Sequence, residues 1–153
     1  MPRIEETIEI AAARADVFRL CHDITRRAEW DEQVVRVEML SSRPVRSGTL
    51  LRIDAKYGNM AVFTWDAEYA EFHMPSNSRM RVLDAAPSSP FAKGSELSWE
   101  FEQVGSGTRL TWVWDYKSQG FINRIMDVLG RRAATQRAIK RSLINLKHLI
   151  ESG

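Results

Sequence analysis

Apolar and polar residues alternate along most of the first 117 positions, and this pattern predicts a strand-rich chain. Side chains of a strand point alternately to its two faces, so each run places its apolar residues on one face of a sheet. The first run has isoleucine at positions 4, 8 and 10, and Glu6 is the one charged residue on that side. Seven strands are predicted, over residues 4–10, 34–40, 49–57, 60–72, 79–84, 97–103 and 109–117.

Short turn-forming sequences separate the later strands and predict an antiparallel order. Gly58 and Asn59 form one turn, and residues 75–77 and 105–107 form two more. Hairpins of this kind pair consecutive strands, which gives a sheet with one apolar and one solvated face. Between the first two strands, the pattern predicts short helices over residues 11–20 and 24–28.

A single long helix is predicted over residues 120–152, which contain no proline and only one internal glycine, Gly130. One face carries the apolar residues Phe121, Ile125, Val128, Ile139, Leu143, Leu146 and Ile150, at spacings typical of an amphipathic helix. Polar Arg132, Thr135 and Gln136 interrupt this face. Two interpretations stay open: the helix centre covers a cavity whose occupant needs hydrogen bonds, or the helix bows away and these groups reach water.

Length, charge and cysteine content narrow the class of protein. The 153 residues predict one domain, residues 1–153, and 22 basic against 20 acidic side chains give a net charge of +2. This balance argues against a nucleic-acid-binding protein. The single cysteine excludes an internal disulfide, and no run approaches the ~20 apolar residues of a membrane span. We therefore expect a cytoplasmic protein, monomer or homodimer, with no stable membrane association.

Known cofactor and nucleophile motifs do not occur in the sequence. His22, His73 and His148 are far apart, so no metal site is predicted. Phosphate-binding and dinucleotide-binding fingerprints are missing, and we predict no cofactor. Cys21 lies in a predicted helix without a nearby base, and we interpret it as a small buried side chain.

Several motifs resemble one known family. They are the sequence ADVF at residues 15–18, the pair Trp30-Asp31, GSGTRLTW at residues 105–112, and LINLKHLIE at residues 143–151. Together with the order of elements, they resemble the polyketide cyclase/dehydratase and lipid-transport family of the START-like superfamily. The resemblance implies an α+β helix-grip fold. In this fold a curved seven-stranded antiparallel sheet wraps around a long C-terminal helix, with two short helices between strands 1 and 2 and a deep cavity inside.

The resemblance also implies which residues line that cavity. Trp30 is expected at the entrance, Phe91 on a mobile lip, and Gln136 pointing down from the helix. The strands are expected to contribute Phe63, Trp65, Tyr69, Trp99, Trp112 and Trp114. For each tryptophan, ordinary core packing is the competing interpretation, because an aromatic side chain buries a large apolar area without any ligand.

Two functions from different classes follow. The first is a carrier or sensor that binds a hydrophobic or aromatic small molecule, lipid-like or polyketide-like, without changing it. The second is a polyketide aromatase/cyclase-dehydratase in which Tyr69 and Arg132 handle protons and stabilise an enolate. Arg79 and Arg81 are expected to point outward, away from such a site. A third interpretation, an adaptor that uses the basic face of the long helix, has the least support.

Overall fold

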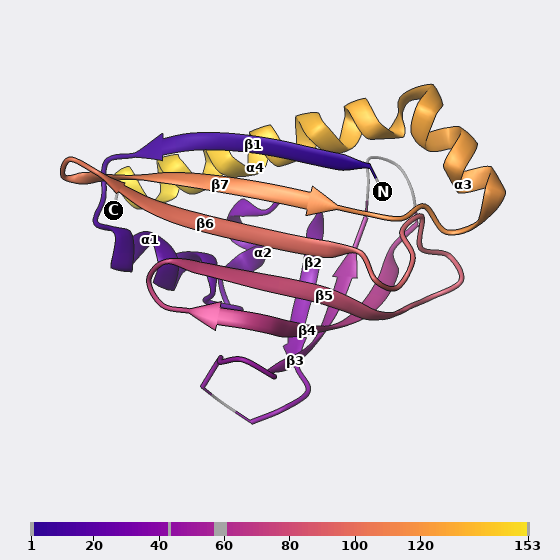
Figure 1. Ribbon diagram of the computed structural model, residues 1–153, viewed down its shortest axis with the longest axis horizontal. Helices are drawn as coiled ribbons and strands as arrows, with labels where there is room; N and C mark the ends of the chain where they lie inside the picture. Colours follow the sequence, from indigo (N-terminus) through magenta and orange to yellow (C-terminus); the bar gives the residue numbers. More distant parts are fainter. Residues whose placement is uncertain (1, 43, 57–60, 153) are drawn as a thin grey trace.

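The computed structural model describes residues 2–42, 44–56 and 61–152, and its elements follow the predicted order (Figure 1). They are β1 (Arg3–Ile10), α1 (Arg14–Cys21), α2 (Arg27–Trp30), β2 (Val34–Met39), β3 (Leu50–Ala55), β4 (Phe63–His73), β5 (Asn77–Ala85), β6 (Glu96–Val104), β7 (Gly107–Asp115), α3 (Gly120–Met126), the π-helical segment η1 (Asp127–Arg131) and α4 (Arg132–Glu151). The predicted turn at Gly58 and Asn59 lies outside the described residues.

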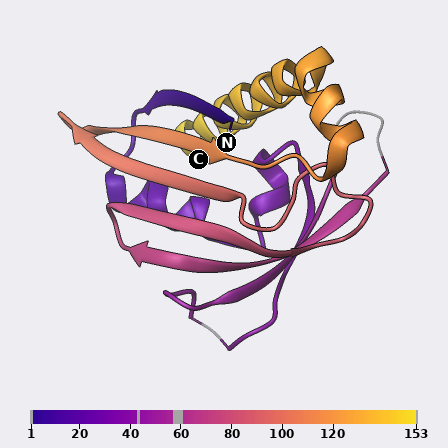
Figure 2. The same ribbon diagram turned by 45° about the vertical axis from the view of Figure 1, so that its right-hand side comes forward.

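The strands form one antiparallel sheet in the order β1-β7-β6-β5-β4-β3-β2. Each hairpin pairs neighbours in the sequence, and β1 closes the far edge by pairing with β7, from Arg3 opposite Asp115 to Ile10 opposite Thr108. The sheet curves, and α4 lies across it while packing against β1 and α2 (Figures 1 and 2). The expected helix-grip architecture is confirmed. Among the described residues, no helix is long and apolar enough to cross a membrane.

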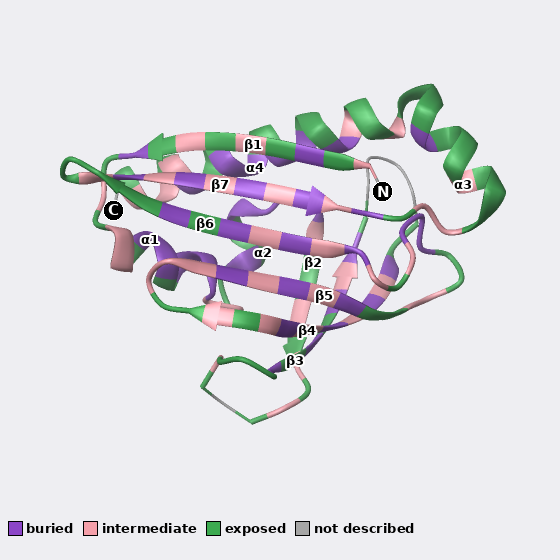
Figure 3. Cartoon of the chain, in the orientation of Figure 1, coloured by how far each residue is buried: buried purple, intermediate pink, exposed green. Residues whose placement is uncertain are grey.

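Burial alternates along the central strands as the sequence predicts (Figure 3). In β4, Phe63, Trp65, Ala67 and Tyr69 are buried, and the residues between them are partly exposed. A β-bulge after Tyr69 then shifts the register against β5 and moves the inward face to even positions. Phe72, which the strict alternation turns outward, therefore packs against the core.

The short helices begin and end later than predicted. The first covers Arg14–Cys21 and buries Val17, Phe18 and Leu20, as expected. The second was expected over residues 24–28, before Trp30, but it spans Arg27–Trp30. This shift places Arg27 and Trp30 on the inner side, where both are buried.

The C-terminal helix is bent, which corrects the prediction of a single helix whose apolar residues from Phe121 to Ile150 share one face. In α4, Ile139, Leu143 and Leu146 are buried against the sheet as expected. At η1, however, Gly130 leaves the helical conformation, with φ 164° and ψ −20°, and α3 continues in another direction (Figure 2). None of the residues of α3 is buried, and Phe121 is 72% exposed.

Candidate functional site

The space between the sheet and α4 is a narrow cavity of about 30 Å³. Its wall is formed by Arg27, Asp31, Gln33, Val34, Ile53, Ala55, Trp65, Met80, Leu97, Trp112, Trp114 and Ile139. A water molecule needs roughly 10–15 Å³ measured in this way, so the space accommodates about two waters. The deep cavity that the resemblance implies is therefore largely filled, because aromatic side chains of β4, β6 and β7 occupy it.

The predicted ligand-binding residues of the strands and loops separate into two groups. Trp65, Trp112 and Trp114 line the cavity. A second group does not line the cavity but is buried around it: Trp30, Phe63, Phe91 and Trp99. Their rings contact neighbouring rings, with centroid distances of 5.8 Å between Trp30 and Trp99 and 5.3 Å between Phe63 and Trp65.

Gln136 does not point into the cavity, which corrects its expected placement. Its side chain is exposed, and its Nε2 donates to Oε1 of Glu6 at 2.8 Å. Glu6 interrupts the apolar pattern of β1, and Gln136 is one of the polar residues that interrupt that of the long helix. These two residues thus bind each other at the edge of the sheet. Neither interpretation of the helix centre holds for all three residues: Arg132 and Gln136 reach water, whereas Thr135 is buried and donates to the carbonyl oxygen of Arg131 at 2.8 Å.

A buried ion pair forms the polar end of the cavity. Both Nε and Nη2 of Arg27 lie 2.8 Å from Oδ2 of Asp31, and the two side chains are 7% and 1% exposed. The other carboxylate oxygen of Asp31 accepts the backbone N–H of Gln33 at 3.1 Å. The guanidinium carbon of Arg27 also lies 4.6 Å from the ring centre of Trp99 and 5.2 Å from that of Trp30. Such stacking holds the cation by its interaction with the ring faces.

Sequence reasoning missed Arg27, although it singled out the neighbouring pair Trp30-Asp31. A basic residue on a short helix is usually a surface residue. The available signal was the spacing of four positions between Arg27 and Asp31, which places the two charges on one side of a helix turn.

Several hydrogen-bond donors of this interior have no partner in the described protein. The indole Nε1 atoms of Trp30, Trp99, Trp112 and Trp114 are buried and unpaired, and so is Nε2 of Gln33. Trp65 differs, because its Nε1 donates to Oγ of Ser89 at 2.8 Å. Buried donors are paired in the great majority of cases, so this concentration is unusual and marks a place where acceptor atoms are expected.

Burial keeps three other titratable groups of the interior neutral, His22, Tyr69 and Cys21. His22 contacts the carbonyl oxygen of Phe18 through Nδ1 at 2.8 Å and Oγ of Ser78 through Nε2 at 2.7 Å. Because the carbonyl can only accept, Nδ1 carries the proton and Nε2 accepts from the serine hydroxyl. Burial lowers the pKa of His22 to about 3, raises that of Tyr69 to about 12, and raises the pKa of the Cys21 thiol.

The structure does not bring the two predicted catalytic residues together. Tyr69 is buried beside His22, with ring centroids 5.6 Å apart. Arg132 lies at the start of α4 with its side chain 48% exposed, and it donates to Tyr116 Oη at 3.1 Å and to Asp127 Oδ2 at 2.8 Å. Burial first, and the hydrogen bond to Asp127 second, raise the pKa of Tyr116 to about 12. Arg132 thus belongs to a separate cluster that helps to anchor η1.

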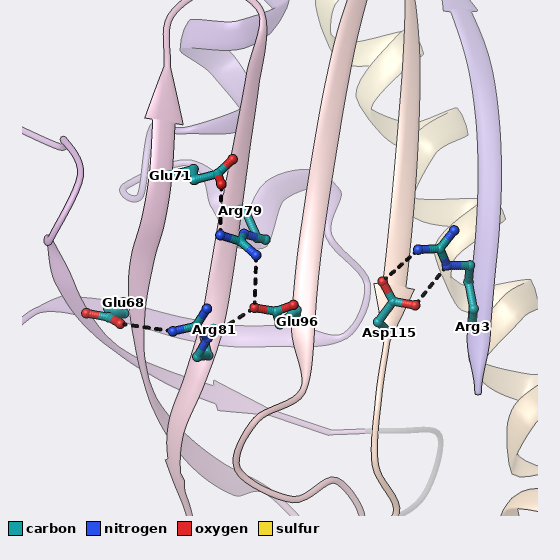
Figure 4. Close-up of polar contacts among 7 residues, drawn as sticks. All are labelled: Arg3, Glu68, Glu71, Arg79, Arg81, Glu96 and Asp115. Carbon is teal, nitrogen blue, oxygen red and sulfur yellow. Dashed lines mark hydrogen bonds and ion pairs between the residues drawn. The ribbon is translucent and has the colours of Figure 1, made fainter. Parts of the chain in front are cut away.

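Arg79 and Arg81 point to the outer face of the sheet, as predicted (Figure 4). Arg79 binds Glu71 at 2.8 Å, and Arg81 binds Glu96 at 3.0 Å. The figure shows both arginines of β5 between acidic partners on β4 and β6. Both arginines therefore pair with carboxylates on the outer face of the sheet, and neither supplies a cation to the cavity.

An open groove of about 420 Å³ lies outside the cavity, between the C-terminal helical segments and the ends of β2 and β3. It is lined by Glu32, Gln33, Lys56, Met126, Leu129, Gly130, Arg131, Ala134, Arg137, Ala138 and Arg141. Gln33 belongs to the walls of both spaces, so the groove adjoins the cavity at this side chain. Within the described residues, no group of three or more His, Cys, Asp or Glu side chains is placed to hold a metal ion.

Comparison with solved structures gives the same fold at low sequence identity. The protein TTHA0849 from Thermus thermophilus matches with a TM-score of 0.81 and 20% identity, over 99% of this chain and 100% of its own. The aromatase/cyclase Zhui from Streptomyces sp. R1128 matches with a TM-score of 0.73 and 15% identity, over 97% and 95%. The ginseng major latex-like protein 151 from Panax ginseng matches with a TM-score of 0.74 and 9% identity, over 95% of each chain.

Sequence comparison shows the family. No curated protein sequence matches the chain. The family model described as polyketide cyclase / dehydrase and lipid transport matches residues 1–151, which is nearly the whole sequence. This agrees with the seven-stranded sheet, the long C-terminal helix and the resemblance of the motifs described above. The chain therefore belongs to the polyketide cyclase / dehydrase and lipid transport family.

Proposed function

We propose that the protein binds a hydrophobic or aromatic small molecule between the sheet and α4, and that this molecule carries oxygen atoms that accept hydrogen bonds. The unpaired donors of the interior carry this proposal. Trp112, Trp114 and Gln33 line the cavity, and each has a buried N–H group without a partner among the described residues. A carbonyl or hydroxyl oxygen placed among them would remove the free-energy cost of about 1–3 kcal/mol that an unmade buried hydrogen bond carries.

The ligand gains space when the α3–η1 segment moves. A cavity of about 30 Å³ is far below the roughly 300–1,000 Å³ of typical small-molecule sites. The adjoining groove is larger, and one of its walls is formed by Met126, Leu129 and Gly130 of the α3–η1 segment. Elements with few buried apolar contacts open at low free-energy cost, and α3 buries none of its residues. Displacement of this segment widens the groove, and a shift of the Gln33 side chain, which lines both spaces, joins it to the cavity.

The protonation states support binding without conversion. At neutral pH, His22 is neutral and cannot act as an acid, because its pKa is about 3. Tyr69 keeps its proton, because its pKa is about 12. General acid–base catalysis is efficient when the pKa of the group lies near the working pH. The alternative, a polyketide cyclase/dehydratase, requires Tyr69 to give up and regain a proton near neutral pH, although its pKa is about 12. It also requires Arg132 to act with Tyr69, but Arg132 lies in a different cluster, with Tyr116 and Asp127.

A titration with prodan, an uncharged aromatic ketone whose fluorescence reports its surroundings, tests the proposal. We expect saturable binding of one molecule, with energy transfer from the tryptophans. Replacing Gln33 by Leu removes one donor and is expected to weaken binding about two- to twelvefold, because a hydrogen bond contributes about 0.5–1.5 kcal/mol. The control is Gln103→Leu, at an exposed position of β6. Lack of saturable binding, or equal effects of the two substitutions, would contradict the proposal.

The ligand itself can be identified from the purified protein. Native mass spectrometry measures the mass of any complex, and extraction under denaturing conditions releases the bound molecule. A discrete lipid-like or aromatic mass, released unchanged, is the expected result. A mixture of substrate and dehydrated or cyclised product would favour the enzymatic alternative.

A further inference from the structure

We propose that the ligand is an anionic amphiphile, whose carboxylate or phosphate group stays in the outer groove while its apolar part passes Gln33 into the interior. This inference rests on the proposed function and specifies the chemical class of the ligand. It is carried by the charges of the groove, by its apolar surface, and by its continuity with the cavity.

Among the described residues, three cations of the groove have no acidic partner. Arg141 and Glu32 neutralise each other through hydrogen bonds of 2.7–3.0 Å, and this contact lowers the pKa of Glu32. The side chains of Lys56 and Arg137 form no ion pair or hydrogen bond with other described residues. Arg131 binds only the neutral side chain of Asn123, from Nη1 to Oδ1 at 2.6 Å. The positive charge of the groove is thus left for a ligand.

Apolar groups lie beside these cations. Met126 and Leu129 line the groove and are 45% and 75% exposed, and Ala134 and Ala138 add small apolar side chains from α4. Figure 3 colours most of the α3–η1 segment as exposed, where the C-terminal helix bends. Large exposed apolar residues next to unpaired cations match a molecule that has an apolar body and an acidic head.

Gln33 connects the groove to the interior. Its side chain lines both spaces, is 7% exposed, and has an unpaired Nε2. Its backbone is fixed on both sides, because its N–H donates to Asp31 and its carbonyl oxygen accepts from the N–H of Lys56 at 2.9 Å. A chain that enters from the groove therefore meets a positioned hydrogen-bond donor at the point where it becomes buried.

Binding of cis-parinaric acid and of its uncharged alcohol, measured by fluorescence, tests the inference. The two probes share their polyene chain and differ in the acidic group. We expect the acid to bind at least about tenfold more tightly, because a hydrogen bond to a charged group contributes about 1.5–3 kcal/mol. Arg137→Gln and Lys56→Gln are expected to remove most of this preference. Added NaCl should weaken binding of the acid more than that of the alcohol, because salt screens exposed charges.

The control variant is Arg124→Gln, which removes an exposed cation of α3 that does not line this groove. It is expected to leave the preference for the acid unchanged. Equal affinities for acid and alcohol would overturn the inference, and the proposed function would stand. If neither probe binds but prodan does, the inference also falls alone; if no probe binds, both fall. Competition by dodecanoate and by dodecyl phosphate then distinguishes a carboxylate from a phosphate as the preferred head.

Discussion

Removing one member of the Arg27–Asp31 pair should destabilise the protein strongly. The two side chains are 7% and 1% exposed, so either charge left alone remains away from water. Breaking a buried ion pair at one partner costs about 3–5 kcal/mol. We expect Asp31→Asn and Arg27→Met each to lower the free energy of unfolding by this amount. The asparagine substitution keeps the shape of the side chain and loses the charge, whereas methionine fills the stacked position above Trp99 without a charge.

Urea unfolding followed by circular dichroism at about 222 nm measures the effect. With a slope of about 2 kcal/mol per M for a domain of this size, a loss of about 4 kcal/mol lowers the unfolding midpoint by about 2 M. The double variant Arg27→Met/Asp31→Asn should cost less than the sum of the single variants, by about 1–3 kcal/mol, because residues in contact are coupled.

The chain offers a matched control one residue away. Arg26 pairs with Glu29 at 2.9 Å, but these side chains are 44% and 48% exposed. Exposed pairs of this kind contribute about 0–1 kcal/mol, so Arg26→Met should have little effect. Single variants of the buried pair that cost less than about 1 kcal/mol, or a double variant whose cost is the simple sum, would refute the reasoning.

Three further changes test other parts of the structure. The contribution of His22 to stability should be fully present above pH 6.5 and should fall as the pH drops from 6.5 to about 3, because only the unfolded chain binds a proton at His22 in this range. The free energy of unfolding should decrease by up to about 1.4 kcal/mol per pH unit. His22→Gln should reduce this slope in urea titrations at several pH values. Gly107→Ala should cost roughly 1–3 kcal/mol in thermal unfolding, because its Cβ would lie 2.8 Å from the carbonyl oxygen of Ile10. Tyr69→Phe should leave prodan affinity unchanged, as measured by the same titration.

Each of these changes has a control or a contradicting result. His73 is exposed, so His73→Gln should keep the pH slope of the parent protein; a His22→Gln variant with that same slope would contradict the burial argument. Ser106→Ala, beside Gly107, should be nearly neutral, and equal losses for the two substitutions would contradict the predicted clash. Loss of turnover of a poly-β-ketone mimic in Tyr69→Phe, with binding intact, would favour the cyclase alternative.

The sheet could be predicted from the sequence, because a strand repeats every two residues and its partners are set by short turns. Phe63, Trp65 and Tyr69 are on the predicted face for this reason. Phe72 could not be placed, since the bulge depends on the register with β5 and leaves no local signal.

The bend of the C-terminal helix and the polar end of the cavity could not be predicted. Helical periodicity describes a face relative to the axis of one helix, and it contains no information about a change of axis at Gly130. Phe121 fits the predicted stripe and is nevertheless exposed. Arg27 was missed because its burial depends on Asp31 and on tryptophans from distant strands, and their convergence follows from the tertiary fold.

The pairing of β1 with β7 has a consequence for how the chain is made. Arg3 and Asp115, which bind each other at 2.8 Å, are 112 residues apart in the sequence. At about 5–20 residues per second, the ribosome synthesises the partner of β1 roughly 5 to 20 s after β1 itself. During this time the backbone of β1 lacks its partner strand, and α4, which packs against β1, is synthesised later still. Because its partner is the last strand to be made, we expect the edge strand β1 to be the last to join the sheet.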